Sequence, residues 1–520
     1  MKSKNIVLFA LLLNASVAAD ISAQKLPLVY DVENTGAGFP APPMPPLNAL
    51  PVINSFPDPF LWADSSSRLL YKSDWMRRRS QIGAQIQHYE IGVKPPRPDS
   101  ITATYSRSDS MLRIYVTVGS QTLTLTSKIT LPSGTGPFPA VIGMNSPSGS
   151  IPSTIFTSRN IVRITFTHNQ VTAYGNPQNS DPYYRLYPQY NVDNTGQYSA
   201  WAWGVSRIID GLELAKDSLP IDRKHLAVTG CSYAGKMALF AGAFDERIAL
   251  TIAQESGGGG ATLWRYSHSE PAGTVECIDN TDYNWFMNSM KDFSGDNVSR
   301  LPVDHHELMA MVAPRALYVS GNPDYTWLSN PSCFAASATC EIIYHALGVT
   351  DRFGYSVVGG HAHCAVPSIQ IPEIEAFVDK FLLGKDTVNT RGISDTPYSI
   401  DFVPWIQWSS QVLLDNPTLS VDEYKSVSEQ FGLQQNYPNP FNPTTTIRYT
   451  VQKPSHVELN IYNSLGQVIA TLIDTFKASG EYSVTWEGKD SFSKHVPSGT
   501  YFYKIRTGDF TSAKKMIYVK

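Results

Sequence analysis

Residues 226–236 read Leu-Ala-Val-Thr-Gly-Cys-Ser-Tyr-Ala-Gly-Lys and place Ser232 between two kinds of secondary structure. The apolar, β-branched run 226–229 predicts a buried strand that stops at Gly230, and the residues after Ser232 favour a helix. A serine at such a turn is typical of a nucleophile elbow, whose tight backbone requires small residues two positions to either side. Gly230 and Ala234 meet this requirement. By itself the spacing Gly-x-Ser-x-Ala is a weak indication, because structural serines also occupy such turns.

Short apolar strands are predicted on both sides of this stretch. They cover residues 140–144, 161–166, 248–253, 316–320 and 355–358, and a helix is predicted over 197–216. Apolar strands that alternate with helices indicate a mostly parallel sheet covered on both faces. Residues 100–131 alternate between apolar and polar, which predicts antiparallel strands. We therefore predict an α/β fold, in which chemistry gathers at the carboxyl ends of the strands.

A serine hydroxyl needs a base, and the base needs an acid that orients it. Residues 359–364, Gly-Gly-His-Ala-His-Cys, follow the last predicted strand and offer His361 and His363 as the base. Two carboxylates compete for the role of the acid: Asp324 follows the strand 316–320, and Glu255 follows the strand 248–253. The spacing of the residues alone does not separate these two acids.

Four glycines, Gly257 to Gly260, come directly after Glu255 and Ser256. Such a run predicts either a backbone that approaches the site closely or a flexible surface loop.

Composition excludes several classes of function. The formal charge is −4 at pH 7 and has no long single-sign blocks, so we expect neither a nucleic-acid partner nor binding to an anionic membrane surface. The five cysteines form no paired Cys-x-x-Cys arrangement, so we expect no metal site. The 27 tyrosines and 10 tryptophans suit a carbohydrate or aromatic ligand.

The first residues have the pattern of a secretory signal peptide. Lys2 and Lys4 precede an apolar run over 6–13 and small residues over 16–19. The apolar run is too short to span a bilayer, and no later stretch approaches a membrane span. We therefore expect an exported protein, in which disulfides are permitted.

The remaining boundaries follow from changes in composition. A proline-rich lead-in opens a domain over 20–410, and a mixed, polar linker is predicted over 411–430. Residues 431–520 contain alternating runs, such as 457–462 and 501–506, that are separated by Pro, Gly and Asn turns. This pattern predicts a small all-β sandwich after the signal peptide at 1–19 and the α/β domain.

Motifs spread over roughly residues 50–400 resemble the glucuronoyl esterases, carbohydrate esterase family 15. The matching stretches are Pro57 to Phe60, Asp74-Trp75 with Arg77 to Arg79, Ala200 to Arg207, Gly230 to Ser232 with Gly235-Lys236, Gln254 to Gly257, Trp264-Arg265, Leu301 to Asp304, Ala313 to Arg315, Trp327, and His363-Cys364. The resemblance implies a three-layer α/β-hydrolase sandwich. It also implies cleavage of the ester between the (4-O-methyl-)glucuronic acid of glucuronoxylan and lignin alcohols, without a metal or cofactor.

The resemblance assigns the catalytic roles that spacing left open. It implies that Ser232 is the nucleophile, His363 the base and Glu255 the acid. Asp324 then remains a candidate second acid nearby.

The resemblance also implies a set of supporting contacts. Cys231 and Cys364 match the disulfide beside the family's active site, which leaves Cys277, Cys333 and Cys340 with at most one further bond. Lys236 and Trp327 match positions that contact the uronic acid. Separately, we expect the protein to be a monomer.

One residue departs from the family pattern. The position after the nucleophile is usually an arginine that helps to hold the developing oxyanion, and here it is Tyr233. The backbone N–H of Tyr233 can still donate to the oxyanion, but its side chain brings no positive charge. Loss of one such donor typically costs on the order of 3 kcal/mol of transition-state stabilisation. The identity of the substrate is therefore less constrained than the type of reaction. An esterase of other preference, for acetyl or feruloyl groups on xylan, is one alternative, and a non-catalytic surface glycan-binding protein is another.

The last domain resembles the sorting domains of type IX secretion. The resemblance lies in residues 436–447, Tyr462-Asn463, Leu465-Gly466, the run Ser498 to Lys504 and a lysine-rich end. It implies export to the cell surface or the medium through a secretion machinery that reads this domain. A plain β-sandwich binding module is the alternative.

Overall fold

A computed structural model describes residues 26–98, 100–415, 432–451, 455–463, 466–477, 480–491, 494–507 and 510–519. The chain forms two compact units. The larger unit is Met1–Glu33, Met44–Trp75 and Gln85–Asn416; the smaller is Asn34–Pro43, Met76–Ala84 and Pro417–Lys520. The predicted signal peptide at 1–19 and most of the predicted linker at 411–430 lie outside the described residues.

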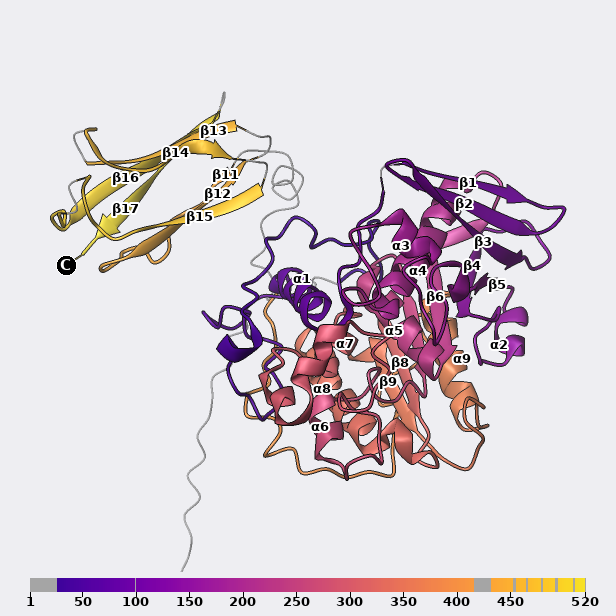
Figure 1. Ribbon diagram of the computed structural model, residues 1–520. Helices are drawn as coiled ribbons and strands as arrows, with labels where there is room; N and C mark the ends of the chain where they lie inside the picture. Colours follow the sequence, from indigo (N-terminus) through magenta and orange to yellow (C-terminus); the bar gives the residue numbers. More distant parts are fainter. Residues whose placement is uncertain are drawn as a thin grey trace, which may run out of the picture. The chain divides into compact units, whose positions relative to one another are not determined.

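The larger unit is built on a ten-stranded sheet with the order β1-β2-β3-β5-β4-β6-β7-β8-β9-β10 (Figure 1). Its strands are β1 (Ser100–Ser106), β2 (Met111–Val118), β3 (Gln121–Thr130), β4 (Phe138–Met144), β5 (Val162–Phe166), β6 (Ile221–Cys231), β7 (Leu250–Gln254), β8 (Ala316–Gly321), β9 (Phe353–Val357) and β10 (Ser394–Asp395). Strands β4 to β10 pair in parallel, whereas β1, β2 and β3 pair antiparallel and β3 joins β5 in the same way. The predicted mostly parallel sheet and the predicted antiparallel strands over 100–131 are confirmed.

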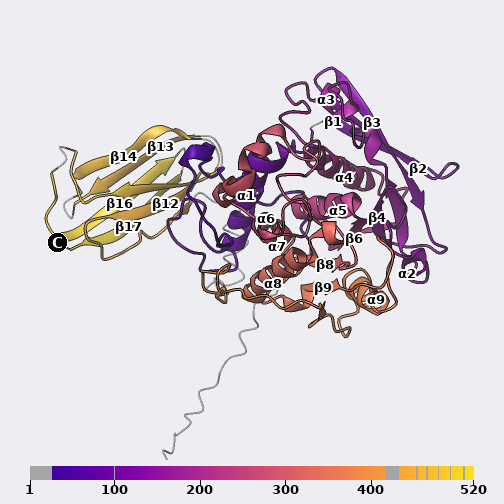
Figure 2. The same ribbon diagram turned by 60° about the horizontal axis from the view of Figure 1, so that its bottom comes forward.

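Helices cover both faces of the parallel part of the sheet. The described α-helices of the whole chain are α1 (Asp74–Ile86), most of which belongs to the smaller unit, and α2 (Ser153–Thr157), α3 (Pro182–Leu186), α4 (Gln197–Leu214), α5 (Tyr233–Phe244), α6 (Trp264–Ser269), α7 (His305–Ala310), α8 (Asn330–Ala346) and α9 (Gln370–Phe381) of the larger unit. Leu250 and Ile252 of β7 pack in one cluster with Phe377 of α9, while the intervening Thr251 lies against α5 at Gly242. Because successive strand residues point to opposite faces, α5 and α9 lie on opposite sides of the sheet, as Figure 2 shows. This is the expected three-layer α/β-hydrolase arrangement.

The described residues of the smaller unit from Gly432 onward form a β-sandwich. Its strands are β11 (Gly432–Leu433), β12 (Thr445–Val451), β13 (Ser455–Tyr462), β14 (Val468–Lys477), β15 (Gly480–Trp486), β16 (Gly499–Thr507) and β17 (Phe510–Tyr518). They form a sheet of order β11-β12-β15 and a second of order β14-β13-β16-β17. Alternate residues of both sheets, such as Ile447 of β12 and Leu459 of β13, meet in one buried core. The predicted all-β sandwich is confirmed.

Among the described helices, none combines the length and the apolar character that crossing a membrane requires.

Candidate active site

Ser232 occupies the turn between β6 and α5. Its backbone has φ 59° and ψ −130°, a combination that residues other than glycine rarely adopt. A side chain at Gly230 would lie 2.2 Å from the carbonyl oxygen of Ala234, so the turn excludes any larger residue there. The strained turn presents Ser232 at the carboxyl end of β6, with the helix beginning at the next residue. This is the geometry of a nucleophile elbow.

Glu255 lies directly after β7, the strand next to the one that carries the serine. Its side chain is 1% exposed and its φ is 42°, so the backbone is again held in an unusual conformation. One carboxylate oxygen, Oε2, lies 2.6 Å from Nδ1 of His363 and also accepts the backbone N–H of Cys364 at 3.1 Å. Because Nδ1 of His363 is engaged by this carboxylate, Nε2 is the nitrogen left for a serine proton.

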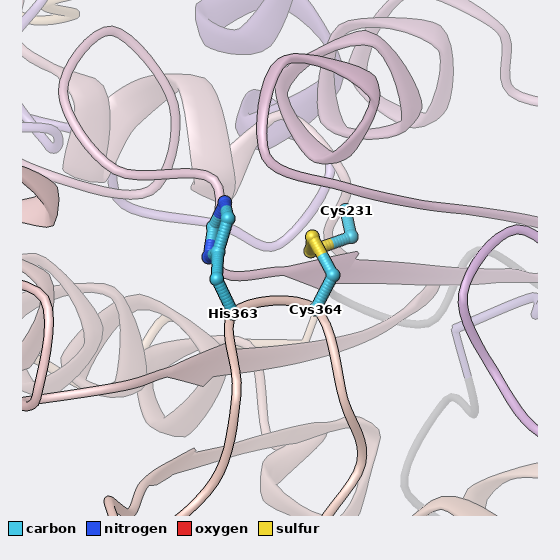
Figure 3. Close-up of side chains that lie close together, drawn as sticks. All are labelled: Cys231, His363 and Cys364. Atoms are coloured by element: carbon cyan, nitrogen blue, oxygen red, sulfur yellow. A yellow bond between two sulfur atoms is a disulfide. The ribbon is translucent and has the colours of Figure 1, made fainter.

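The loop of His363 is joined covalently to the strand of Ser232. Cys231 and Cys364 form a disulfide that links residues 133 positions apart, in the pairing that the resemblance implies. Figure 3 shows the imidazole of His363 beside this bond, and a ring nitrogen of His363 lies within 4.8 Å of both sulfur atoms. The residues that flank the serine and the histidine are therefore fixed to one another. The other described cysteines, Cys277, Cys333 and Cys340, are buried free thiols.

The second acid candidate has a different partner. The carboxylate of Asp324 accepts the backbone N–H of Gly360 at 2.6 Å and packs against Gly359, so it supports the loop that carries the histidines. His361, the other base candidate, has its Nε2 2.8 Å from the carbonyl oxygen of Val358 and its Nδ1 3.8 Å from Glu255. Of the four candidate residues, the structure pairs Glu255 with His363 most directly.

The glycine run after Glu255 is buried and is not a flexible surface loop. A side chain at Gly258 would lie 2.3 Å from the carbonyl oxygen of Glu276, and one at Gly260 would lie 2.6 Å from Ser256. The glycines let the backbone of residues 257–260 pack closely beside the site. This agrees with the predicted close approach of the backbone and not with the alternative of a flexible surface loop.

Lys236, one turn into α5, points to a carboxylate that sequence reasoning missed. Its Nζ lies 2.6 Å from Oε2 of Glu276 and 4.4 Å from the ring centre of Trp285. Glu276 also donates its backbone N–H to the carbonyl oxygen of Trp327, which connects the two predicted substrate-binding positions. No motif in the sequence marks Glu276, because it lies in an irregular segment more than 20 residues after β7.

Trp327 is an exposed aromatic side chain of the site. It is 49% exposed, and its ring centre lies 5.9 Å from that of His363 and 4.8 Å from that of Tyr325. Tyr325 in turn accepts the backbone N–H of His363 at 2.9 Å through its hydroxyl. An exposed indole edge-on to the imidazole offers an apolar surface for a sugar ring next to the proposed base.

Tyr233, the departure from the family pattern, belongs to a second group that sequence reasoning missed. Its hydroxyl accepts a hydrogen bond from Nδ2 of Asn145 at 2.6 Å, and Oδ1 of Asn145 is bonded to Nδ1 of His168. The ring of Tyr174 packs 4.2 Å from that of Tyr233. Asn145 follows β4 and His168 follows β5, so the carboxyl ends of two strands supply this group. Burial raises the pKa of the Tyr233 hydroxyl and lowers the pKa of His168 to about 4.

Comparisons with known proteins show what this chain is similar to. A family described as glucuronyl esterase of fungi matches residues 114–348, and the FlgD Ig-like domain family matches residues 442–509. The chain is 38% identical to a 4-O-methyl-glucuronoyl methylesterase of Podospora anserina, over 69% of this chain and 75% of the relative. It is 40% identical to 4-O-methyl-glucuronoyl methylesterase 1 of Wolfiporia cocos, over 69% of this chain and 89% of the relative.

Solved structures show the same likeness. One is a serine-to-alanine mutant of the glucuronoyl esterase from Sporotrichum thermophile in complex with methyl 4-O-methyl-β-D-glucopyranuronate. It matches 70% of this chain and 97% of its own, with 34% identity and a TM-score of 0.64. A carbohydrate esterase family 15 glucuronoyl esterase from Caldicellulosiruptor kristjansonii matches 70% of this chain and 99% of its own, with 32% identity and a TM-score of 0.59.

Proposed function

Because the chain belongs to the glucuronoyl esterases of carbohydrate esterase family 15, we propose that it is a serine esterase of glucuronate esters. Its substrate is the ester between the (4-O-methyl-)glucuronic acid of glucuronoxylan and a lignin alcohol. The observation that carries the proposal is the contact of the buried Glu255 with His363, whose loop a disulfide ties to the strand of the strained Ser232 elbow. Three positions far apart in the sequence thereby supply the nucleophile, the base and the acid of an ester hydrolase.

The reaction proceeds in two steps. Nε2 of His363 takes the proton of the Ser232 hydroxyl as its oxygen attacks the ester carbonyl carbon, and the carbonyl π electrons move to the oxygen. When the tetrahedral intermediate collapses, the alcohol leaves with the proton from His363, and a glucuronoyl ester of Ser232 remains. Water then attacks this ester by the same route, which releases the uronic acid and restores the serine. Glu255 holds the imidazole in position and stabilises its positive charge during both steps.

The developing oxyanion has a donor in the backbone N–H of Tyr233. This N–H belongs to the first residue of α5, so it has no acceptor within the helix. The residue after the nucleophile supplies one oxyanion donor in α/β-hydrolases generally.

The uronic acid ring lies against Lys236, Glu276 and Trp327. The ammonium group of Lys236 and the carboxylate of Glu276, which form one ion pair, offer a donor and an acceptor for ring hydroxyls. The exposed indole of Trp327 provides the apolar contact. We expect this site to work without a metal or cofactor and in a monomer.

Release of methanol from methyl glucuronate tests the proposal. We expect the purified protein to release methanol and Ser232→Ala to lower the rate by about 10⁴-fold or more, because the nucleophile is lost. The variant should melt at the temperature of the wild type, which separates lost chemistry from lost folding. Turnover of the same size in wild type and variant would refute the assignment.

A second candidate function is favoured by Tyr233, which stands where the family usually has arginine. It is an esterase with a preference for acetyl or feruloyl groups on xylan. Rates on acetylated and feruloylated xylan, measured beside the rate on methyl glucuronate, distinguish the two. A non-catalytic glycan-binding protein would show neither rate and would not react with a serine-directed phosphonate.

The C-terminal β-sandwich is proposed to direct export. Its likeness to FlgD Ig-like domains supports the β-sandwich, and the sorting role rests on the motifs between residues 436 and 504. Together with the signal peptide at 1–19, it would bring the esterase to the cell surface or the medium through a secretion machinery. Expression with and without residues 431–520, followed by fractionation of the producing cells, tests this role: equal export of both forms would contradict it.

A further inference from the structure

Tyr233, the residue after Ser232, is held in place by a series of hydrogen bonds with Asn145 and His168. We call these three side chains the wall beside Ser232. Asn145 donates to the Tyr233 hydroxyl at 2.6 Å and accepts from Nδ1 of His168. Asn145 is exposed to solvent and has φ 63°, an unusual backbone conformation for a residue other than glycine. The ring of Tyr174 covers Tyr233 at 4.2 Å. Tyr233 therefore has a fixed place, although it is only partly buried.

Each of the three hydrogen-bonded side chains is uncharged. His168 is 4% exposed, and its Nε2 has no hydrogen-bond partner among the described residues. A protonated imidazole would leave a buried N–H unpaired there, and burial lowers the pKa of His168 to about 4. The single proton of the neutral ring lies on Nδ1, because its partner, Oδ1 of Asn145, can only accept. Burial also raises the pKa of Tyr233, so its hydroxyl stays protonated.

The cation of the site, Lys236, is neutralised by a carboxylate. Lys236 is paired with Glu276 at 2.6 Å, and the buried Glu255 adds a carboxylate behind His363. Among the side chains described at this site, positive charge is therefore matched or exceeded by negative charge.

From this arrangement we infer that Tyr233, positioned by Asn145 and His168, is a specificity-determining residue that makes the site select a neutral uronate ester over the uronate anion. The inference rests on the proposed function. Hydrolysis turns an uncharged ester group into a carboxylate at the same place, beside the residue that follows Ser232. A carboxylate taken from water into a site without a free cation loses hydration that neutral donors replace only in part. The product therefore leaves readily, and xylan chains that have already been hydrolysed do not occupy the enzyme.

The test places a cation at this position and measures binding instead of turnover. Calorimetry measures how tightly glucuronate and methyl glucuronate bind to four proteins that all carry Ser232→Ala. The parent keeps Tyr233, and the other three carry Tyr233→Arg, Tyr233→Lys or Tyr233→Gln. We expect both cationic variants to bind glucuronate about tenfold more tightly than the parent, with an effect that fades at high salt. Tyr233→Gln, which is uncharged, should leave the ratio of the two affinities within about twofold. Two cationic variants are used so that one misfolded protein does not end the test, and thermal melting shows which ones fold.

Three results would overturn the inference. They are a parent protein that binds glucuronate as tightly as its methyl ester, cationic variants with unchanged affinity for glucuronate, and a parent that binds neither compound. Failure of the proposed function looks different, because it is absence of methanol release by the protein with Ser232 intact.

Discussion

The two sides of Ser232 are built in different ways. On one side, a disulfide and a buried carboxylate fix His363, which must accept a proton within a narrow range of positions. On the other side, Tyr233 is fixed by hydrogen bonds between neutral groups and by ring packing. The first side carries the proton transfers of the reaction, and the side chains of the second remain uncharged throughout. The comparison indicates that covalent restraint is placed where the chemistry depends on position, and neutral contacts where it depends on the absence of charge.

The largest expected effect comes from the charged side. Glu255→Ala should lower kcat for methyl glucuronate by about 10³–10⁴-fold, because the imidazole loses both its orientation and the stabilisation of its positive charge. Asp324→Ala removes an acceptor for a loop N–H and should lower kcat by less than about tenfold. Steady-state rates of the two purified variants give the comparison.

The two acids are a matched pair, since both contact the loop that carries His363 and only one contacts its imidazole. Thermal melting of both variants shows how much of each effect is loss of folding. If kcat fell more in Asp324→Ala than in Glu255→Ala, Asp324 would be the acid that orients His363. The contrast between the two sides of Ser232 would then no longer hold.

The disulfide should contribute stability as well as position. Replacing Cys231 and Cys364 together by serine frees a loop of 133 residues in the unfolded chain, which should lower the free energy of unfolding by about 2–5 kcal/mol. The rate on methyl glucuronate should fall too, because the loop of His363 is no longer tied to the strand of Ser232. Denaturation followed by fluorescence measures the first effect. The control is Cys333→Ser, which changes a buried free thiol and leaves the bond intact. Equal rates in the double variant and the wild type would show that the bond does not position the base.

The sequence identifies the charged side of the site far better than the neutral one. The elbow could be predicted because its strain demands Gly230 and Ala234 at fixed spacing, and the strands because buried parallel strands are continuous apolar runs. The choice between Glu255 and Asp324 could not be made from spacing, because both follow strands that end at the same edge of the sheet. It depended on the family resemblance, and the contact of Glu255 with His363 agrees with it.

The residues of the neutral side carry no such signal. Asn145 and His168 are single polar residues after ordinary strands. Their role depends on hydrogen bonds between side chains that are distant in the sequence, which no local pattern encodes. Glu276 was missed for the same reason, because its partner Lys236 lies 40 positions away. Position after a strand predicts that a residue lies at the rim of the sheet, but not which neighbour it will meet.

The smallest expected effect comes from the neutral side and appears as pH dependence of stability. The pKa of His168 falls from 6.5 to about 4 on folding, so the folded protein excludes a proton that the unfolded chain binds. The contribution of the neutral His168 to the free energy of unfolding is therefore complete above about pH 6.5. As the pH falls toward 4, the free energy of unfolding decreases by about 2 kcal/mol. His168→Gln keeps an uncharged N–H donor for Asn145 and cannot titrate, so this part of the acid loss should disappear. Urea denaturation of both proteins at several pH values between 4 and 7 measures the difference, with His456→Gln, at an exposed histidine of the β-sandwich, as the control. Parallel pH profiles for wild type and His168→Gln would mean that folding does not lower the pKa of His168, so the wall beside Ser232 would not stay neutral below about pH 6.5.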